Sequence, residues 1–373
     1  MGATSPTPDV LRVEELRVYF PLRRTLTEVL KRLPPRYIRA VDGVSFSIKE
    51  GEFFCLVGES GCGKTTTGKA ILRLVPPTSG RILFRPREET LKLVRAALGN
   101  RLDRYLDGGM VDVVKLPAKA MRVLRRDMQY VHQDPYGSLN PRYRIRQIVE
   151  EPLIIHGVRD QGLRLKLVKE ALERAALRPP EAFLNRYPHQ LSGGQRQRVA
   201  IARAIVLNPK FIVADEPVSM LDVSVRAEVL EVMKSLQKDM GIAFLFITHD
   251  LATARYVCDR IGVLYLGKLV ELGPADEVLH NPLHPYTKAL IAAVPEPNPE
   301  NRLKLREVPI KGEVPSPINV PQGCRFRPRC VVYDALGGDV RRLCETREPP
   351  LVEVRRGHYV ACWAVQKGAS GAS

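Results

Sequence analysis

Short apolar runs alternate with amphipathic stretches along much of the chain. The alternation of β-branched and polar residues over 11–20 predicts a strand, and residues 40–60 predict two more strands joined by a turn near Gly51. Two later apolar runs, 210–217 and 241–250, each lie between stretches with helical periodicity. Because buried strands that alternate with helices are typical of a parallel sheet, the pattern favours an α/β fold with helices on both faces.

Two stretches interrupt this alternation. Residues 23–37 form a short basic amphipathic insert, and residues 85–108 form a charged insert with partial helical character. We interpret the second insert as a solvated excursion, with a specific contact surface as the alternative. After about residue 273 prolines become dense, and four of the seven cysteines follow. We therefore predict two units, residues 1–272 and a C-terminal extension over 273–373.

The balance of charge is strongly basic. The 373 residues have a formal net charge of +17, which suits either a polyanionic partner or a solvated, Arg-rich surface. The charges are spread along the chain, which favours the solvated surface or a role beside a membrane. No apolar run approaches the ~20 residues that cross a bilayer, and the first residues lack the pattern of a secretory signal. We expect a cytoplasmic protein.

A glycine-rich loop follows one of the predicted strands. Residues 58–65 fit G-x-x-x-x-G-K-[ST] between that strand and a predicted helix. Glycines let backbone N–H groups point at phosphate oxygens, and the helix N-terminus adds the positive end of a dipole. We expect Lys64 to reach the β- and γ-phosphates, Thr65 to ligate Mg²⁺ and Thr66 to contact the α-phosphate. The nucleotide-binding residues expected in this loop are Gly58, Ser60, Gly61, Cys62, Gly63, Lys64, Thr65 and Thr66.

Four polar side chains lie at the ends of predicted strands. Asp215 and Glu216 end a buried strand, where carboxylates are costly unless they serve a charge such as Mg²⁺. We expect Asp215 to hold the metal through water and Glu216 to be the base that polarises the attacking water. Gln133 can ligate Mg²⁺ or orient water, and His249 can hydrogen-bond a γ-phosphate oxygen, although each alone is also typical of a structural polar residue. The expected Mg²⁺ ligands are Thr65, Gln133 and Asp215, and the expected catalytic residues are Glu216, His249 and Gln133.

The pentapeptide "LSGGQ" over 191–195 places two glycines at the start of a predicted helix, although glycine destabilises helices. Together with "GESGCGKTT", "QDP", "VADEPVSMLD" and "ITHD", in this order and spacing, it resembles the ATP-binding cassette (ABC) ATPases over residues 10–272. The resemblance implies a P-loop NTPase ABC cassette with a RecA-like core, an antiparallel β subdomain and a helical signature subdomain. It also implies ATP and Mg²⁺ as cofactors.

In the ABC ATPases two cassettes face each other head to tail, so the resemblance implies that each ATP lies between one phosphate loop and the partner's LSGGQ. Ser192 can cap its helix and offer its hydroxyl to a γ-phosphate oxygen. Gly193 and Gly194 let backbone N–H groups approach that phosphate. Gln195 completes this set, and Asp222 lies in a tight connection from which it can reach the partner chain.

An aromatic side chain stacks on the base in this family, usually just after the first strand. Phe20 matches that place best. Tyr19 and Tyr37 are alternatives, because the insert over 21–36 disturbs the spacing. We therefore expect Phe20 to stack on adenine.

Four further stretches resemble ATPase subunits of oligopeptide/dipeptide ABC importers: "QDPYGSLNPR", "SMLDVSVRAEVL", "HNPLHPYTKALIAAVP" and "GEVPSPINVPQGCRFRPRC". The sequence of the last stretch resembles the second of the two ATPase subunits of such importers. The resemblance implies ATP-driven uptake of oligopeptides or dipeptides by a peripheral subunit at the cytoplasmic face of the membrane. The implied partners are a second ATPase subunit in a heterodimer, two transmembrane permease subunits and an extracytoplasmic solute-binding protein. A cytoplasmic permease helix would enter the groove beside Gln133.

Other functions stay open beside peptide uptake. Cassettes of this type also serve oligosaccharide and nickel uptake. A soluble ABC ATPase acting on nucleic acid or ribosomes would suit the charge, but such chains commonly have two cassettes or a long coiled-coil insert. Here one phosphate loop and one LSGGQ occur, without sustained heptads, so we expect no nucleic-acid partner. A non-hydrolysing cassette is disfavoured by the presence of Lys64, Asp215, Glu216 and His249.

Four cysteines, Cys324, Cys330, Cys344 and Cys362, lie within 39 residues, which indicates a thiolate metal site. Their spacing lacks the C-x2-C pairs of common zinc modules. The extension resembles ones in which cysteines hold a [4Fe–4S] cluster, which four thiolates suit, with zinc or no metal as alternatives. We expect the basic segment "CRFRPRC" to lower the pKa values of the thiols.

The other three cysteines lie in the cassette. An odd total of seven in an intracellular chain argues against a disulfide framework. We therefore expect Cys55 and Cys258 to be core residues. Cys62 lies inside the phosphate loop, where we expect no chemical role.

Overall fold

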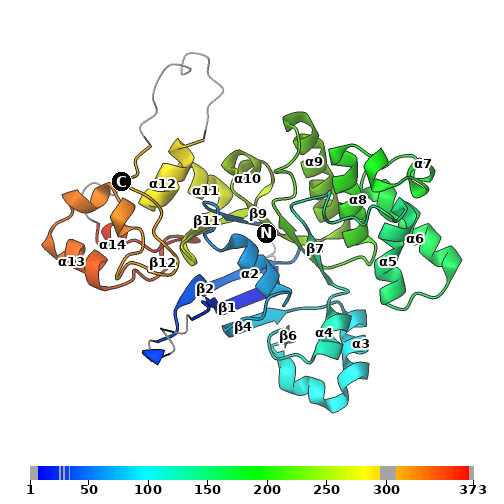
Figure 1. Cartoon of the computed structure of the whole chain (residues 1–373), viewed down its shortest axis with the longest axis horizontal. Helices are drawn as coiled ribbons and strands as arrows, with labels where there is room; N and C mark the ends of the chain where they lie inside the picture. The colour runs from blue at the N-terminus through cyan, green and yellow to red at the C-terminus, as the bar shows by residue number, and fades with distance from the viewer. Residues whose placement is uncertain (1–6, 25–26, 28–29, 33, 295–307, 369–373) are drawn as a thin grey trace, which may run out of the picture.

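The computed structural model describes residues 7–24, 27, 30–32, 34–294 and 308–368. These residues contain two sheets, one of five strands and one of eight, and helices pack around both (Figure 1). One group of helices gathers at one end of the molecule, and the C-terminal elements gather at the opposite end (Figure 1). Within the described ranges, no helix is long and apolar enough to cross a membrane.

The five-stranded sheet is antiparallel and contains the first strands of the chain. In sheet order its strands are β2 (Tyr37–Lys49), β1 (Asp9–Pro21), β4 (Ser79–Phe84), β6 (Met110–Asp112) and β5 (Leu106–Asp107). Buried and exposed side chains alternate along most of β1, which explains why the sequence pattern predicts this strand correctly. The insert over 23–37 lies partly outside the described residues.

The eight-stranded sheet is parallel at its centre. In sheet order its strands are β12 (Val352–Arg355), β13 (His358–Val360), β11 (Lys268–Pro274), β10 (Arg260–Tyr265), β3 (Phe53–Val57), β9 (Ala243–Thr248), β8 (Phe211–Asp215) and β7 (Met128–Val131). The five strands from β10 to β7 run parallel, and every residue of β3, β8 and β9 is buried. This burial on both faces explains their continuous apolar runs and confirms the predicted parallel sheet.

Helices cover the parallel strands and form a separate group beside them. Those that follow the strands are α2 (Lys64–Ile71), α9 (Val223–Met240), α10 (Leu251–Val257), α11 (Ala275–His280) and α12 (Pro285–Ala292). The separate group consists of α5 (Ile145–Ile155), α6 (Gln161–Arg174), α7 (Glu181–Leu184) and α8 (Gly193–Ile205). Helices α5 and α6 both pack against α8, and α8 packs against α9. The helical pattern predicted over 143–180 is thus confirmed, with a break between α5 and α6.

The insert over 85–108 is not a solvated excursion, contrary to our expectation. It forms α3 (Glu88–Leu98), the 3-10 helix η1 (Gly99–Tyr105) and β5, and it packs against α4 (Ala118–Leu124). Val94 and Leu102 are fully buried, and the carboxylate of Asp127 accepts hydrogen bonds from Arg87 N and Thr90 Oγ1 at 2.6 and 2.9 Å. The charged residues occupy only the outer face of an amphipathic helix, whose inner face joins the core of the five-stranded sheet.

Residues 308–368 add to the edge of the eight-stranded sheet. They form η4 (Arg327–Arg329), η5 (Val332–Ala335), α13 (Gly338–Thr346), β12, β13 and α14 (Trp363–Gln366). Strand β13 pairs with β11, and the fully buried pair Glu271 and His358 links the two strands at 2.7 Å. The C-terminal elements therefore continue the eight-stranded sheet beyond β11, while the boundary at residue 272 stays a prediction.

Cys55 and Cys258 form a disulfide, a pairing that the sequence argument opposed. Cys55 lies in β3 and is fully buried, so its place in the core is confirmed. Cys258 caps the end of α10 and lies two residues before β10, which is the parallel neighbour of β3. The prediction failed because the two cysteines are 203 residues apart and meet only through the sheet order.

Candidate nucleotide-binding site

The phosphate loop connects the end of β3 to the start of α2 and borders an open cavity of about 650 Å³. Its backbone requires glycine at Gly63, where φ is +111° and a Cβ would lie 2.1 Å from the carbonyl oxygen of Ala40. The residues lining the cavity are Ala40, Gly58, Glu59, Ser60, Gly61, Gly63, Lys64, Thr65, Thr66, Gln133, Glu216, His249 and Leu290. The structure thus brings together seven of the eight loop residues expected to bind nucleotide.

Lys64 is directed into the loop that it follows. Its ammonium donates hydrogen bonds to the carbonyl oxygens of Gly58 and Glu59 at 2.6 and 2.9 Å, and its side chain is only 4% exposed. Cys62, the loop residue absent from the cavity wall, lies beneath this ammonium, with its sulfur 3.8 Å from Nζ. Burial raises the pKa of the Cys62 thiol, and its expected lack of a chemical role stays a prediction.

Oxygen donors converge at the end of β8. Thr65 Oγ1 donates to one carboxylate oxygen of Asp215 at 2.9 Å, and Tyr130 OH donates to the other at 2.6 Å. Asp215 is 4% exposed, and burial together with its charge raises the pKa of Tyr130. Hydroxyl and carboxylate oxygens are ligands that Mg²⁺ prefers. Sequence reasoning missed Tyr130, although its strand pairs with β8 in a parallel register that brings it beside the same strand end.

The three expected catalytic side chains are in direct contact. Gln133 Nε2 donates to one carboxylate oxygen of Glu216 at 2.9 Å, and His249 Nδ1 lies 3.1 Å from the other. They follow β7, β8 and β9, which are neighbours in the sheet, so their carboxyl ends meet at one edge. Glu216 has a φ of +46°, and its N–H donates to the carbonyl of Ile247 at 2.9 Å, which fixes the backbone below its carboxylate.

Ser192 and Gln195 cap the start of α8. Ser192 Oγ accepts from the N–H of Gln195 at 3.3 Å, and Gln195 Oε1 accepts from the N–H of Ser192 at 3.1 Å. The second glycine of the pentapeptide, Gly194, has a structural cause that the sequence did not suggest. A Cβ there would approach Val225 Cγ1 of α9 to 2.3 Å, whereas a Cβ on Gly193 would meet nothing closer than 3.4 Å.

The signature residues do not meet the phosphate loop within this chain. Ser192, Gly193, Gly194 and Gln195 belong to the separate helical group and do not line the cavity. Asp222, exposed immediately before α9, does not line it either. Binding of one nucleotide by both the phosphate loop and the LSGGQ residues therefore stays a prediction, and it requires a second cassette.

None of the three aromatic residues considered for the base lines the cavity. Tyr19 OH donates to Asp42, and burial followed by this hydrogen bond raises the pKa of Tyr19 to about 12. Phe20 and Tyr37 are 39% and 41% exposed. Phe20 stays our prediction for the residue that stacks on adenine.

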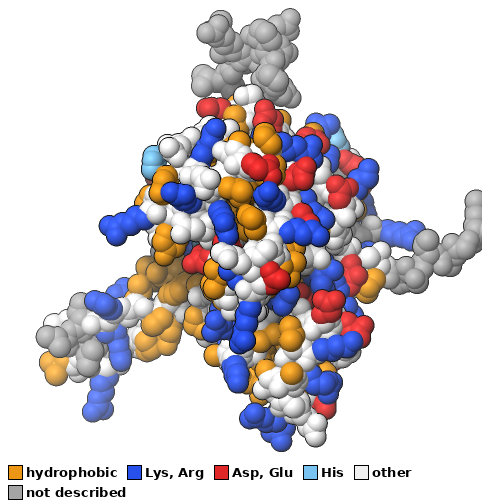
Figure 2. Space-filling model, turned by 90° about the vertical axis from the view of Figure 1, so that its right-hand side faces the viewer, with side chains coloured by type: hydrophobic (Ala, Val, Ile, Leu, Met, Phe, Trp, Pro, Cys, Tyr) orange, Lys and Arg blue, Asp and Glu red, His pale blue; other side chains and the backbone are white. Residues whose placement is uncertain are grey.

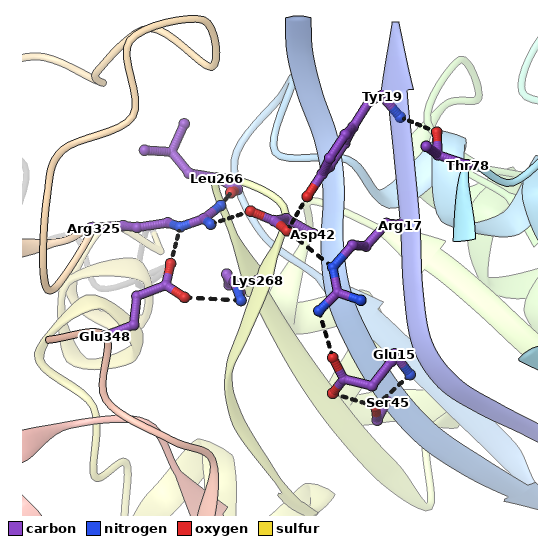
Figure 3. Close-up of polar contacts among 10 residues, drawn as sticks. All are labelled: Glu15, Arg17, Tyr19, Asp42, Ser45, Thr78, Leu266, Lys268, Arg325 and Glu348. Carbon is purple, nitrogen blue, oxygen red and sulfur yellow. Dashed lines mark hydrogen bonds and ion pairs between the residues drawn. The ribbon is translucent and has the colours of Figure 1, made fainter. Parts of the chain in front are cut away.

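The four C-terminal cysteines influence one another electrostatically, but their pKa values are raised, not lowered as we expected. Burial and the neighbouring thiols raise the pKa of Cys324 to about 12 and that of Cys344 to about 11. Two of the three arginines of this segment pair with carboxylates: Arg325 pairs with Asp42 and Glu348 (Figure 3), and Arg329 pairs with Glu59. Among the described residues, no three His, Cys, Asp or Glu side chains are placed to hold a metal ion.

A glycine-rich loop after β3, carboxylates at the end of β8, two strands away in the sheet, and a separate helix that begins within LSGGQ together define an ABC-type ATPase cassette. The family profile "ABC transporter" matches residues 41–219, and "Oligopeptide/dipeptide transporter, C-terminal region" matches residues 270–334. The chain belongs to the ABC transporter family, in its oligopeptide/dipeptide branch. ATP and Mg²⁺ are the cofactors of such an ATPase.

Relatives and solved structures agree with this assignment. The chain is 42% identical to the oligopeptide transport ATP-binding protein AppF of Bacillus subtilis, over 95% of this chain and 96% of that protein. It is 46% identical to a putative peptide import ATP-binding protein of Brucella ovis, over 87% and 92%. Its fold is similar to the cassette MJ0796, solved as a dimer with ADP and Pi, at a TM-score of 0.55, with 30% identity and coverage of 71% of this chain and 98% of that one.

Proposed function

We propose that the chain is the ATP-hydrolysing subunit of an ABC importer that takes up oligopeptides or dipeptides. The observation that supports this most is the contact of Gln133, Glu216 and His249 at one wall of the cavity that the phosphate loop borders. The C-terminal profile and the names of the relatives support a peptide as the solute.

The proposed reaction is attack of water on the γ-phosphorus of ATP. The bond from that phosphorus to the oxygen bridging the β-phosphate breaks, and ADP and phosphate form. Thr65, Gln133 and Asp215 would hold Mg²⁺, which neutralises charge on the phosphates. Glu216 accepts the proton of the attacking water, and Gln133 orients its carboxylate through the hydrogen bond of 2.9 Å. His249 hydrogen-bonds a γ-phosphate oxygen, and Lys64 carries positive charge to the β- and γ-phosphates.

The proposed site is completed by a second cassette, whose LSGGQ covers the nucleotide. Ser192 is exposed at the start of α8, where its hydroxyl and the helix N-terminus can bind the partner's γ-phosphate. Tyr136, three residues after Gln133, is 59% exposed, and its ring lies under the guanidinium of Arg196 at 4.1 Å. We propose that a cytoplasmic helix of a permease subunit enters the groove beside Gln133 and contacts Tyr136.

The further partners are two permeases, a second ATPase subunit in a heterodimer and an extracytoplasmic solute-binding protein, with this chain at the cytoplasmic face of the membrane. On the face formed by the helical group, Lys and Arg are interspersed with Asp and Glu (Figure 2). A mixed surface of this kind supports a protein partner over nucleic acid, which favours continuous basic patches.

We also propose that Cys324, Cys330, Cys344 and Cys362 bind a [4Fe–4S] cluster. The donor chemistry fits, because four thiols influence one another at one end of the molecule. The described geometry does not fit, since no three of them converge, and we derive no step of the mechanism from the cluster. Iron and sulfide assays on anaerobically purified protein test the proposal. Zinc in place of iron, or no metal, would refute it.

The choice of solute is tested in vesicles that contain the complete transporter. ATP hydrolysis is measured with the binding protein and, in turn, oligopeptides, dipeptides, oligosaccharides or nickel. We expect stimulation by peptides alone. Stimulation by nickel or an oligosaccharide, but not by peptides, would assign the machinery to one of those solutes.

A further inference from the structure

Glu59, the second residue of the phosphate loop, forms a bidentate ion pair with the C-terminal region. Arg329 Nη1 and Nη2 donate to the two carboxylate oxygens of Glu59 at 2.9 and 3.1 Å. The side chain of Arg329 is 8% exposed and that of Glu59 27%, so water screens the pair only in part. This fork joins residues 270 positions apart in the chain.

The backbone of Glu59 is also held by a residue beyond position 272. Its N–H donates to the hydroxyl of Tyr286 at 2.9 Å, and Tyr286 is fully buried in α12. The ring of Tyr286 packs against Phe326, which lies three residues before Arg329, with ring centroids 5.4 Å apart. The carbonyl of Glu59 in turn accepts from Lys64 at 2.9 Å. Three groups of Glu59 are therefore fixed, two of them by residues beyond position 272.

The segment that carries Arg329 is itself anchored to the cassette. Arg325 donates to Asp42 of β2, to the carbonyl of Leu266 at 2.6 Å and to Glu348 at 2.6 Å (Figure 3). Glu348 also pairs with Lys268 at 2.9 Å. The backbone that carries Arg329 is thus fixed to the rest of the chain by the contacts of Arg325, and the Arg329 side chain is buried where it reaches the loop.

We propose that Arg329 is a positioning residue for ATP binding, a role that rests on the proposed function of the phosphate loop. Glu59 lines the cavity that would receive the triphosphate, where an unpaired carboxylate repels it. Arg329 neutralises that carboxylate and holds it away from the phosphates. It also fixes the loop in the conformation in which Lys64 faces inward, so less ordering is needed when ATP binds.

The test measures the dissociation constant of a fluorescent ATP analogue for the purified full chain. R329Q should raise it about tenfold, the change that a charged hydrogen bond is worth. R327Q is the matched control, because it removes the same charge from the same 3-10 helix and the side chain of Arg327 makes no hydrogen bond to any described residue. Its dissociation constant should stay at the wild-type value.

The double variant E59Q/R329Q separates a charge effect from damage to the fold. A neutral amide at position 59 no longer repels phosphate, so the double variant should regain most of the lost affinity for ATP. Thermal unfolding of each variant shows whether its fold is intact. Equal affinities of R329Q and R327Q would overturn the proposal, and so would an R329Q defect that E59Q fails to restore. If the wild-type chain binds no ATP, the proposed function fails instead.

Discussion

Replacement of Glu216 by Gln isolates the chemical step from nucleotide binding. The carboxylate accepts from Gln133 Nε2 at 2.9 Å and lies 3.1 Å from His249 Nδ1. An amide of the same shape keeps an acceptor oxygen for one of these two contacts, but it cannot take a proton from water. Because a positioned general base contributes about 10²–10⁴-fold, E216Q should slow hydrolysis by that factor. The phosphate loop is untouched, so ATP affinity should remain.

The assay is ATP turnover by the reconstituted transporter, together with ATP-dependent association of the cassettes. Cassettes that carry E216Q should bind ATP, associate with each other and remain associated, because their dissociation requires ATP hydrolysis. E170Q is a control, since Glu170 is a partly exposed residue of α6 whose carboxylate lies 3.9 Å from Lys166 Nζ and away from the cavity. Turnover by E216Q at the wild-type rate would refute the assignment of Glu216 as the base.

Three other variants or labels test separate parts of the account. Ser192→Arg should leave ATP binding to the isolated chain intact while it abolishes turnover in the complex; loss of binding by the isolated chain would contradict the use of Ser192 by a partner. Gly194→Ala should lower the free energy of unfolding by about 1–3 kcal/mol in urea titrations, because its Cβ would lie 2.3 Å from Val225 Cγ1. Gly193→Ala, with its nearest contact at 3.4 Å, is the control, and equal stabilities would exclude the packing argument. Alkylation of buried Cys62 should be slow at neutral pH and slower with ATP, and it should block nucleotide binding; labelling indifferent to ATP would count against this.

Local patterns predicted the elements and the chemistry that adjoins them. The wholly buried strands β8 and β9 were predicted from apolar runs, and the polar side chains at their ends were assigned to one nucleotide. In the structure these side chains meet because the parallel strands end at one edge of the sheet. What the patterns could not predict depends on distant partners. The disulfide joins residues 203 positions apart, and the pair of Arg329 with Glu59 joins residues 270 apart.

Two errors have the same physical origin. The arginines of "CRFRPRC" were expected to lower the thiol pKa values, but carboxylates of the cassette pair with Arg325 and Arg329 and leave burial to dominate. The second glycine of LSGGQ was assigned to phosphate alone, although Val225 of the neighbouring helix already excludes a side chain there. In both cases the neighbour that decides the outcome could not be known from the sequence.

The central claim is that hydrolysis at this cavity drives peptide uptake, and accumulation of a labelled oligopeptide in reconstituted vesicles tests it most directly. Vesicles with the wild-type chain, its permeases and the binding protein should accumulate peptide only when ATP is supplied on the side of this chain. The same vesicles with E216Q should accumulate none above the ATP-free level. Equal accumulation by both, or none by the wild type despite ATP hydrolysis, would contradict the account.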